Sequence, residues 1–187
     1  MEDTTDKPNF VEKDYSPFGG EFVRTIKGHS SGDMDLIRLK DGRQKVIRSN
    51  ILSVGPHRSL EDVKKASERL MELTKFGINL PDFSIVLAAN QLDKNPKYKS
   101  NTKNNLYAVV DFVDGINLEE APEEIREQVD HALRNYSEHC RLNGIDPLHD
   151  IYSHDQYMYG SINGGPKKPY LVEIDLTNIP EMGILPV

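Results

Sequence analysis

The sequence contains very little cysteine, no tryptophan and no long apolar run. Cys140 is the only cysteine in 187 residues, so a disulfide within the chain is excluded and we expect a reducing, cytoplasmic environment. Cys140 itself is expected to be a small buried residue on a helix. No stretch approaches the roughly 18 apolar residues that span a bilayer, and the amino-terminal residues lack the apolar core of a secretory signal. We therefore expect no membrane partner.

A basic excess is also missing. The chain carries 23 Lys and Arg against 30 Asp and Glu, which gives a formal net charge of −7. General binding to nucleic acid requires a basic face, so this balance argues against nucleic acid as a partner. It does not exclude a nucleotide, because a few local cations and a metal ion suffice to hold one phosphate chain.

Short strands dominate the first half of the sequence. Residues 1–17 are polar and predict a mobile tail. Alternating polar and apolar residues then predict a three-stranded antiparallel meander, in which Asp41-Gly42 forms a hairpin turn. Two further strands are expected after a helix. The five expected strands cover residues 21–27, 35–40, 45–48, 81–87 and 106–113.

Two helices are predicted from capping residues and apolar spacing. The first begins after Ser59, which suits an N-cap, and ends at Gly77. The second begins at Pro122, which suits the first helical position, and ends at Asn143-Gly144. Its apolar stripe comprises Ile125, Val129, Ala132, Leu133, Tyr136 and Cys140. A loop and a pair of apolar strands follow, so the sequence predicts an α+β fold.

Acidic residues gather around these last elements. Asp150 and Asp155 lie in a loop that leads into an apolar strand, and Asp175 follows from the next apolar strand. Carboxylates from a loop and a neighbouring strand can hold a divalent metal over a phosphate, and Mg²⁺ prefers such oxygen ligands. Kinase-like phosphotransferases use this layout. Each acid taken singly is also compatible with an ordinary turn, where Asp is common.

The order and spacing of the elements resemble the protein-kinase-like fold, most closely the aminoglycoside and choline phosphotransferase branch. Residues 149–155, which begin His149-Asp150, are similar to the family's H-x-D-x-x-x-x-N catalytic loop, and residues 171–175 to the strand that carries its metal-binding Asp. Residues 109–118 look like the hinge between lobes, and residues 28–32 occupy the place of the phosphate-covering loop. The resemblance spans about residues 21–178.

The resemblance implies a two-lobe architecture that binds ATP and Mg²⁺. The expected units are the tail at 1–17, a lobe of five-stranded sheet plus helix at 18–115, and a reduced lobe at 116–187 with a helix and a strand pair. A cleft is expected between the lobes. By analogy, Asp150 would be the catalytic base or the residue that orients the acceptor hydroxyl. Asp155 and Asp175 would be metal ligands.

The same resemblance implies a nucleotide-binding set. The backbone at 111–113 would contact the adenine ring, glycines would let the backbone approach the phosphates, and an arginine stands where the family has a phosphate-binding lysine. These residues are Gly28, Gly32, Arg48, Asp111, Phe112 and Val113. Arg can hold phosphate but is not equivalent to Lys. Lys45 lies three residues before Arg48, on the opposite face of a regular strand.

Several departures from the family pattern keep other functions open. No Glu falls on the inward face of the first helix, Asp155 replaces the family's Asn, and the family's substrate-binding helices have no counterpart after Asp175. An inactive, pseudokinase-like module that binds a protein partner is the main alternative. A lobe completed by a partner chain, including a second copy, is another. His149 and His154 also allow a zinc- or iron-type site. A loop, unlike a helix, does not place their two side chains on one face.

Overall fold

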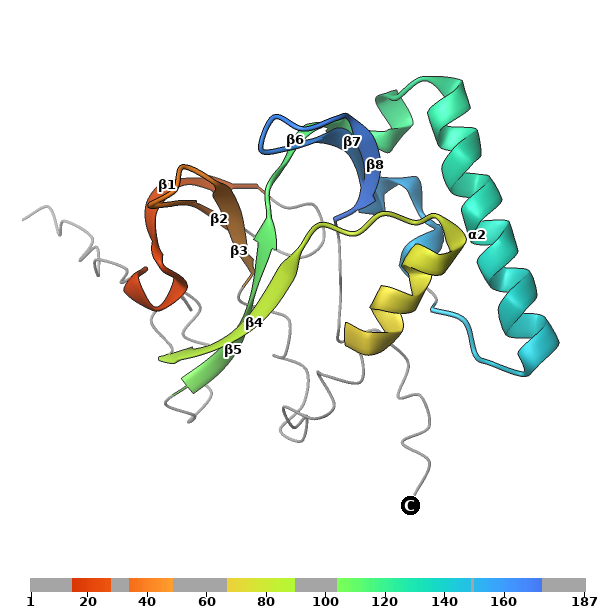
Figure 1. The fold of residues 1–187 in the computed structure, drawn as a ribbon, viewed down its shortest axis with the longest axis horizontal. Helices are drawn as coiled ribbons and strands as arrows, with labels where there is room; N and C mark the ends of the chain where they lie inside the picture. Colours follow the sequence, from red (N-terminus) through yellow and green to blue (C-terminus); the bar gives the residue numbers. More distant parts are fainter. Residues whose placement is uncertain (1–14, 28–33, 49–66, 90–103, 149, 173–187) are drawn as a thin grey trace, which may run out of the picture.

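The computed structural model describes residues 15–27, 34–48, 67–89, 104–148 and 150–172 (Figure 1). These ranges form two antiparallel sheets, a long helix and several short helical turns. The predicted α+β class is therefore confirmed. Within the described ranges, no helix combines the length and the apolar character needed to cross a membrane.

The larger sheet contains the five strands expected from the sequence. Its strands lie in the order β1-β2-β3-β5-β4, and every neighbouring pair is antiparallel. The strands are β1 Gly20–Ile26, β2 Met34–Leu39, β3 Gln44–Arg48, β4 Phe83–Ala89 and β5 Asn104–Asp111. The hairpin between β2 and β3 forms at Asp41-Gly42, where Gly42 has a φ of 89° and so adopts a backbone conformation that favours glycine.

One prediction about β5 was wrong. The apolar run at 106–113 predicts a single strand, but the chain leaves the larger sheet at Phe112, whose amide N–H donates to the carbonyl of Gln44 (3.1 Å). The next residue, Val113, already lies opposite Ile162 in the second sheet. The expected strand pair is therefore a three-stranded sheet in the order β6-β7-β8. Its strands are β6 Val113–Asn117, β7 Tyr157–Ile162 and β8 Lys168–Leu171.

Both predicted helices are present in part or in full. Residues 67–72 are helical and continue into the short turn η2, Leu73–Phe76, which ends at Gly77 as expected. The predicted start at Ser59 lies outside the described residues. The long helix α2 covers Glu123–Asn143 and ends at Gly144, which has a φ of 64°. Pro122 has extended backbone and is the N-cap, so the helix begins one residue later than predicted.

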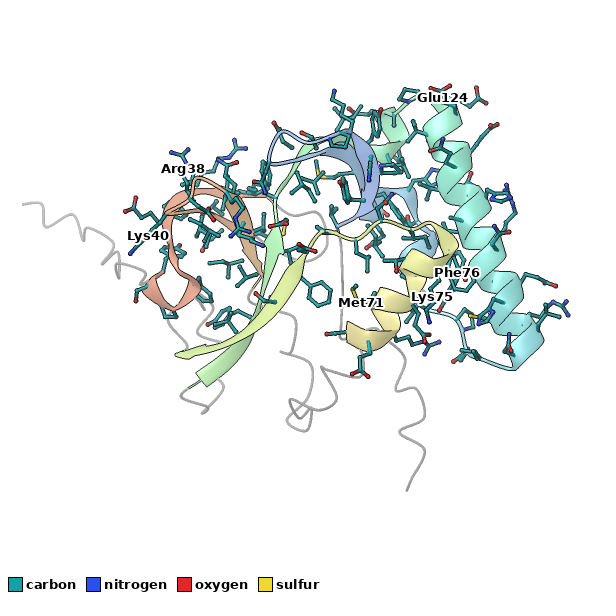
Figure 2. All side chains as sticks on the ribbon, viewed as in Figure 1. Arg38, Lys40, Met71, Lys75, Phe76 and Glu124 are labelled. Atoms are coloured by element: carbon teal, nitrogen blue, oxygen red, sulfur yellow. The ribbon has the colours of Figure 1, made fainter. Side chains whose placement is uncertain are left out.

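The core has two parts on opposite faces of the larger sheet, because successive residues of β5 point to opposite faces. One face buries Ala108 and Val110 together with Leu70, Leu73 and the predicted stripe of α2. Ile125, the first residue of that stripe, is only partly buried. Phe76, labelled in Figure 2, packs edge-on against Tyr136 of α2, with ring centroids 5.4 Å apart.

The other face of the sheet is covered by the turn η1, Ser16–Phe18. Phe18 stacks edge-on against Tyr107 of β5 at 5.3 Å. Tyr15 donates from its hydroxyl to Asp35 of β2 (3.0 Å) and is itself 8% exposed. The predicted mobile tail extends to residue 17, whereas Tyr15 already packs on the sheet.

Candidate functional site

The first candidate region is the junction between the two sheets at residues 111–113, where β5 runs directly into β6 (Figure 1). All three predicted adenine-contacting residues lie here. The amide N–H of Asp111 donates to the carbonyl of Asp82 (2.8 Å), and that of Phe112 donates to Gln44. Both of these N–H groups already donate hydrogen bonds within the protein. An adenine ring would therefore have to hydrogen-bond to other backbone groups of the junction.

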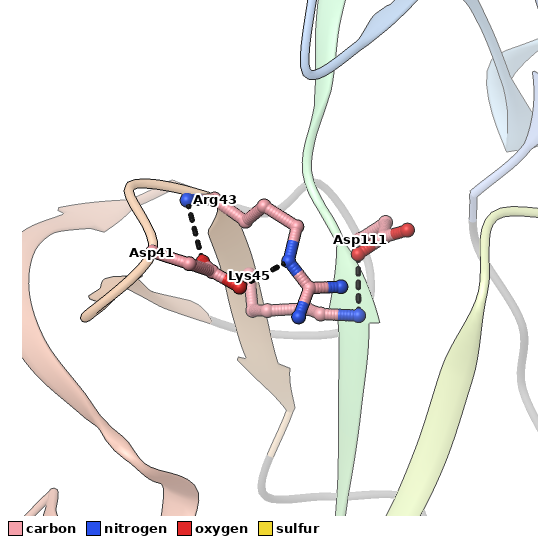
Figure 3. Close-up of polar contacts among 4 residues, drawn as sticks. All are labelled: Asp41, Arg43, Lys45 and Asp111. Atoms are coloured by element: carbon pink, nitrogen blue, oxygen red, sulfur yellow. Dashed lines mark hydrogen bonds and ion pairs between the residues drawn. The ribbon is translucent and has the colours of Figure 1, made fainter.

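A nearly buried ion pair stands at the end of β5. Lys45 and Asp111 are direct partners in the β3–β5 register, and the Lys45 Nζ contacts Asp111 Oδ1 (Figure 3). Their side chains are 14% and 8% exposed. Two charges removed from water in this way depend on each other, since loss of either leaves the other uncompensated. Lys45 is therefore occupied by Asp111 and is not a free phosphate ligand.

A second, exposed ion pair flanks the first. The guanidinium Nε of Arg43 donates to Asp41 Oδ2 at 2.7 Å, and the Arg43 amide N–H donates to Oδ1 at 3.0 Å (Figure 3). These two hydrogen bonds, the backbone one foremost, lower the pKa of the Asp41 carboxyl. The hydrogen bond to Asp41 is also the main reason that the pKa of Arg43 is raised, with smaller contributions from Asp111 and Asp82. Arg43 and Lys45 are thus both paired with carboxylates beside the junction.

The second candidate region is the loop between α2 and β7. It contains two short turns, η5 Asp150–Tyr152 and η6 His154–Gln156. His154 Nε2 lies 2.8 Å from Asp130 Oδ1 of α2, and Asp155 in η6 is exposed. Asp150 begins η5, but its side chain is outside the description. The structure therefore fixes the backbone of this loop against α2 and leaves Asp155 open to solvent.

Two buried tyrosines hold the same loop at its ends. The Leu148 amide N–H donates to the Tyr136 hydroxyl (3.2 Å), and the Tyr157 hydroxyl donates to the carbonyl of Ile151 (2.9 Å). Burial is the main cause that raises the pKa of Tyr136 to about 12 and also raises that of Tyr157. Both phenols are therefore neutral structural groups at neutral pH and act by positioning the backbone around Asp150.

A glycine pair sets the spacing of the second sheet. Gly115 of β6 lies opposite Gly160 of β7. A Cβ on Gly160 would collide with the backbone of Asp114, and one on Gly115 would collide with the backbone of Tyr159. The close approach of these two strands therefore requires glycine on both sides. No pattern in the sequence predicted this pairing, because the two glycines lie far apart in the chain.

The predicted metal site is untested by the described side chains. Across the described ranges, no three His, Cys, Asp or Glu side chains gather closely enough to hold a metal. Asp155 is described, but Asp175 and His149 lie outside the described residues. The carboxylate oxygens of Asp155 and Asp175 are the type of ligand that Mg²⁺ prefers. For the alternative zinc- or iron-type site, Asp130 engages His154 Nε2, so a metal would have to bind through Nδ1.

The remaining predicted nucleotide residues are also only partly described. Gly28 and Gly32 lie outside the described residues. Arg48 is opposite Ala108 in the β3–β5 register, which locates its backbone but not its guanidinium. The backbone can thus be followed at Arg48, at residues 111–113 and in the loop 150–156.

A cavity of about 300 Å³ opens elsewhere, between α2 and the start of β8. Its lining combines buried apolar residues with exposed lysines and includes Ile78, Asn79, Val129, Tyr157, Lys167 and Lys168. Neither the junction residues 111–113 nor the acids Asp150 and Asp155 line it. This cavity therefore gives no support to a nucleotide site between the sheets.

The sequence analysis also missed the partners that the fold brings together. Lys45 and Asp111 lie far apart in the chain, as do Asp130 and His154, and no local pattern links the members of either pair. A charged residue that follows directly on an apolar run, such as Asp111 after Val109 and Val110, is a weak signal of a buried charge that needs a partner. That signal could have been followed to Lys45 once β3 and β5 were paired.

Comparisons with known proteins assign no family. No protein-family model matches the chain, and no curated protein matches it. The residues and the order of the strands are therefore the basis for a function.

Proposed function

We propose that this chain is a kinase-like nucleotide-binding protein that holds ATP and Mg²⁺ at the junction of its two sheets. The observation that carries the proposal is the strand order β1-β2-β3-β5-β4, followed by direct passage through Phe112 into a second sheet. Kinases place ATP between two such units, with the phosphates under the first hairpin and the metal ligands supplied by the second unit. The loop 150–156, fixed to α2 by Tyr136 and His154, supports this assignment from the second unit.

The proposed reaction is transfer of the γ-phosphoryl group to an acceptor hydroxyl. Asp150 accepts the hydrogen bond, and finally the proton, of that hydroxyl, so that its oxygen attacks the γ-phosphorus. The bond from the γ-phosphorus to the bridging oxygen breaks, and ADP leaves. Asp155 and Asp175 would hold Mg²⁺, which would neutralise charge on the phosphate oxygens. The rest of the rate comes from positioning by the fixed loop.

A second function, an inactive binding module, is favoured by one observation. Lys45, the lysine nearest the usual phosphate-binding position on β3, is tied to Asp111 in a nearly buried pair. Only Arg48 then remains on that strand to hold phosphate. A module of this kind would keep the fold and recognise a protein partner without turning over ATP.

The first test is the thermal unfolding midpoint of the full chain with and without millimolar ATP and Mg²⁺. Saturating nucleotide at about 100 times its dissociation constant stabilises by about 2.7 kcal/mol. At about 2–4 °C per kcal/mol in a domain of this size, the midpoint should rise by about 5–11 °C. Asp175→Asn should remove the Mg²⁺-dependent part of this shift. Asp41→Asn, which alters an exposed acid of the hairpin, is the matched control and should keep it.

Turnover separates the two proposed functions. An active enzyme hydrolyses or transfers the γ-phosphoryl group slowly in the presence of Mg²⁺, and Asp150→Asn abolishes that activity while nucleotide binding remains. Binding without any turnover in the wild type, across small-molecule and protein acceptors, would select the inactive module. Absence of nucleotide binding would reject the nucleotide proposal altogether.

A further inference from the structure

The cavity of about 300 Å³ between α2 and the start of β8 has walls that the fold holds in place. The Leu171 amide N–H donates to the carbonyl of Asn79 (2.9 Å), and the Asn79 side-chain amide donates to the carbonyl of Pro169 (3.0 Å). These hydrogen bonds join the segment after η2 to β8, and Leu171 packs in the same core cluster as Val129 of α2 (Figure 1). The cavity is therefore formed before any ligand binds, as is usual for small-molecule sites.

The inner wall of this cavity is apolar. Its side chains Ile78, Val129 and Ala132 are 5% exposed or less, and Tyr157 is 1% exposed. The Tyr157 hydroxyl already donates to the carbonyl of Ile151, so the one polar group of this set is engaged within the protein. Transfer of hydrocarbon from water onto such a surface is favourable. The inner wall therefore suits the apolar body of a ligand.

The outer rim of the cavity is basic. Lys167 and Lys168 line it with exposed side chains, and neither ammonium group has an ion-pair partner among the described residues. No Asp or Glu of the described ranges lines the cavity, although the chain as a whole has a net charge of −7. Glu124 and Glu127 of α2 line a separate surface depression, which shares only Gln128 with the cavity. Two uncompensated ammonium groups attract an anion and donate charge-assisted hydrogen bonds to it.

We propose that this cavity binds a small organic carboxylate with an apolar body, of the medium-chain fatty-acid type. The hydrocarbon chain lies against Val129, Ala132 and Tyr157, and the carboxylate hydrogen-bonds to Lys167 and Lys168 at the rim. A volume of about 300 Å³ is at the lower end of the range of about 300–1,000 Å³ that small-molecule sites occupy, which favours a short chain over a long lipid. The proposal does not depend on the nucleotide function, because none of the residues proposed to bind ATP or Mg²⁺ lines the cavity.

The test is a titration of the isotope-labelled full chain with octanoate, followed by the chemical shifts of its backbone amides in nuclear magnetic resonance spectra. The proposal predicts saturable binding at one site, with the amides of Gly77, Val129 and Lys168 among those that shift most. Two further probes separate the apolar body from the charge. Acetate keeps the carboxylate without the chain, and octylammonium keeps the chain with the opposite charge. Each should bind at least about tenfold more weakly than octanoate, because acetate buries almost no hydrocarbon and the basic rim repels a cation.

A charge variant tests the rim. The double substitution Lys167→Gln and Lys168→Gln should weaken octanoate binding by about fivefold or more and remove its dependence on ionic strength. Both side chains are exposed, so the variant should fold as the wild type does. Arg134→Gln, which removes an exposed cation of α2 outside the cavity, is the matched control and should bind octanoate as the wild type does. The proposal is overturned if octanoate gives no saturable shifts at the cavity, if acetate or octylammonium binds equally well, or if the double variant binds octanoate with unchanged affinity.

Discussion

Lys45 of β3 and Asp111 at the end of β5 face each other across the larger sheet as an ion pair whose side chains are 14% and 8% exposed. The pair stands where the chain leaves one sheet for the other, since Phe112 is the only residue between β5 and β6. It ties the exit of β5 to β3 beside the backbone hydrogen bond from Phe112 to Gln44. The geometry of the proposed nucleotide junction therefore depends on a buried charge pair.

Removal of either partner should be strongly destabilising. Lys45→Met leaves the Asp111 carboxylate buried without a counter-charge, and Asp111→Leu leaves the Lys45 ammonium in the same state. We expect each change to lower the free energy of unfolding by about 3–5 kcal/mol, measured by urea denaturation. The double variant, which buries no charge, should be far more stable than the sum of the single effects predicts. Simple additivity would show that the two groups do not interact.

The close strands of the second sheet give a steric prediction. Gly160→Ala places a Cβ against the backbone of Asp114 and Gly115, neither of which is a flexible side chain that can move aside. We expect the free energy of unfolding to fall by about 1–3 kcal/mol or more. Gly165→Ala is the matched control, because its Cβ would meet only the Ile162 carbonyl at 3.2 Å. Equal effects of the two substitutions would argue against the close β6–β7 approach.

Tyr157 gives a prediction for alkaline pH. Burial, reinforced by Tyr152 and Asp130, raises the pKa of its phenol above the ordinary value of 10.0. Folding thus favours the neutral phenol, so the contribution of Tyr157 to stability is complete below pH 10 and declines as the pH rises from there toward the pKa of the folded state. Stability measured by urea denaturation should fall above pH 10 in the wild type and fall less in Tyr157→Phe.

The control for this pH dependence is Tyr170→Phe, which removes one phenol from the neighbouring strand β8. At neutral pH, Tyr157→Phe should also be slightly less stable than the wild type, because it loses the hydrogen bond to Ile151, worth about 0.5–1.5 kcal/mol. If the alkaline loss is the same in the wild type and Tyr157→Phe, the buried phenol is not its source.

Local signals in the sequence were reliable because they act over a few residues. Asp41-Gly42 forms its hairpin, Gly77 and Gly144 end their helices with left-handed backbone, and the apolar stripe of α2 is buried except for the partly buried Ile125. Each of these depends on neighbours within a few positions, where backbone angle and helical period decide the outcome. The meander of β1, β2 and β3 was predicted, whereas the order in which β5 and β4 extend the sheet was not.

Long-range pairings could not be predicted in the same way. The break at Phe112 occurs because Val113 pairs with Ile162, and nothing in the apolar run 106–113 marks that change of partner. Arg69 lies next to the apolar stripe of its helix and was not identified as buried, because helical period alone does not place a long charged side chain. For the site, a loop before β7 was expected and is present at 150–156. Residues 111–113 were expected within one strand, and the chain instead changes sheets there. The chemical roles of both regions remain predictions.

The most direct test of the central proposal is an isothermal titration of the full chain with ATP, in Mg²⁺ and in its absence, beside Asp175→Asn and the control Asp41→Asn. The proposal predicts saturable binding of one nucleotide per chain that weakens at least tenfold without Mg²⁺ and in Asp175→Asn, while Asp41→Asn binds as the wild type does. Absence of heat in the wild type, or binding that is indifferent to both Mg²⁺ and Asp175, would contradict a kinase-like nucleotide site.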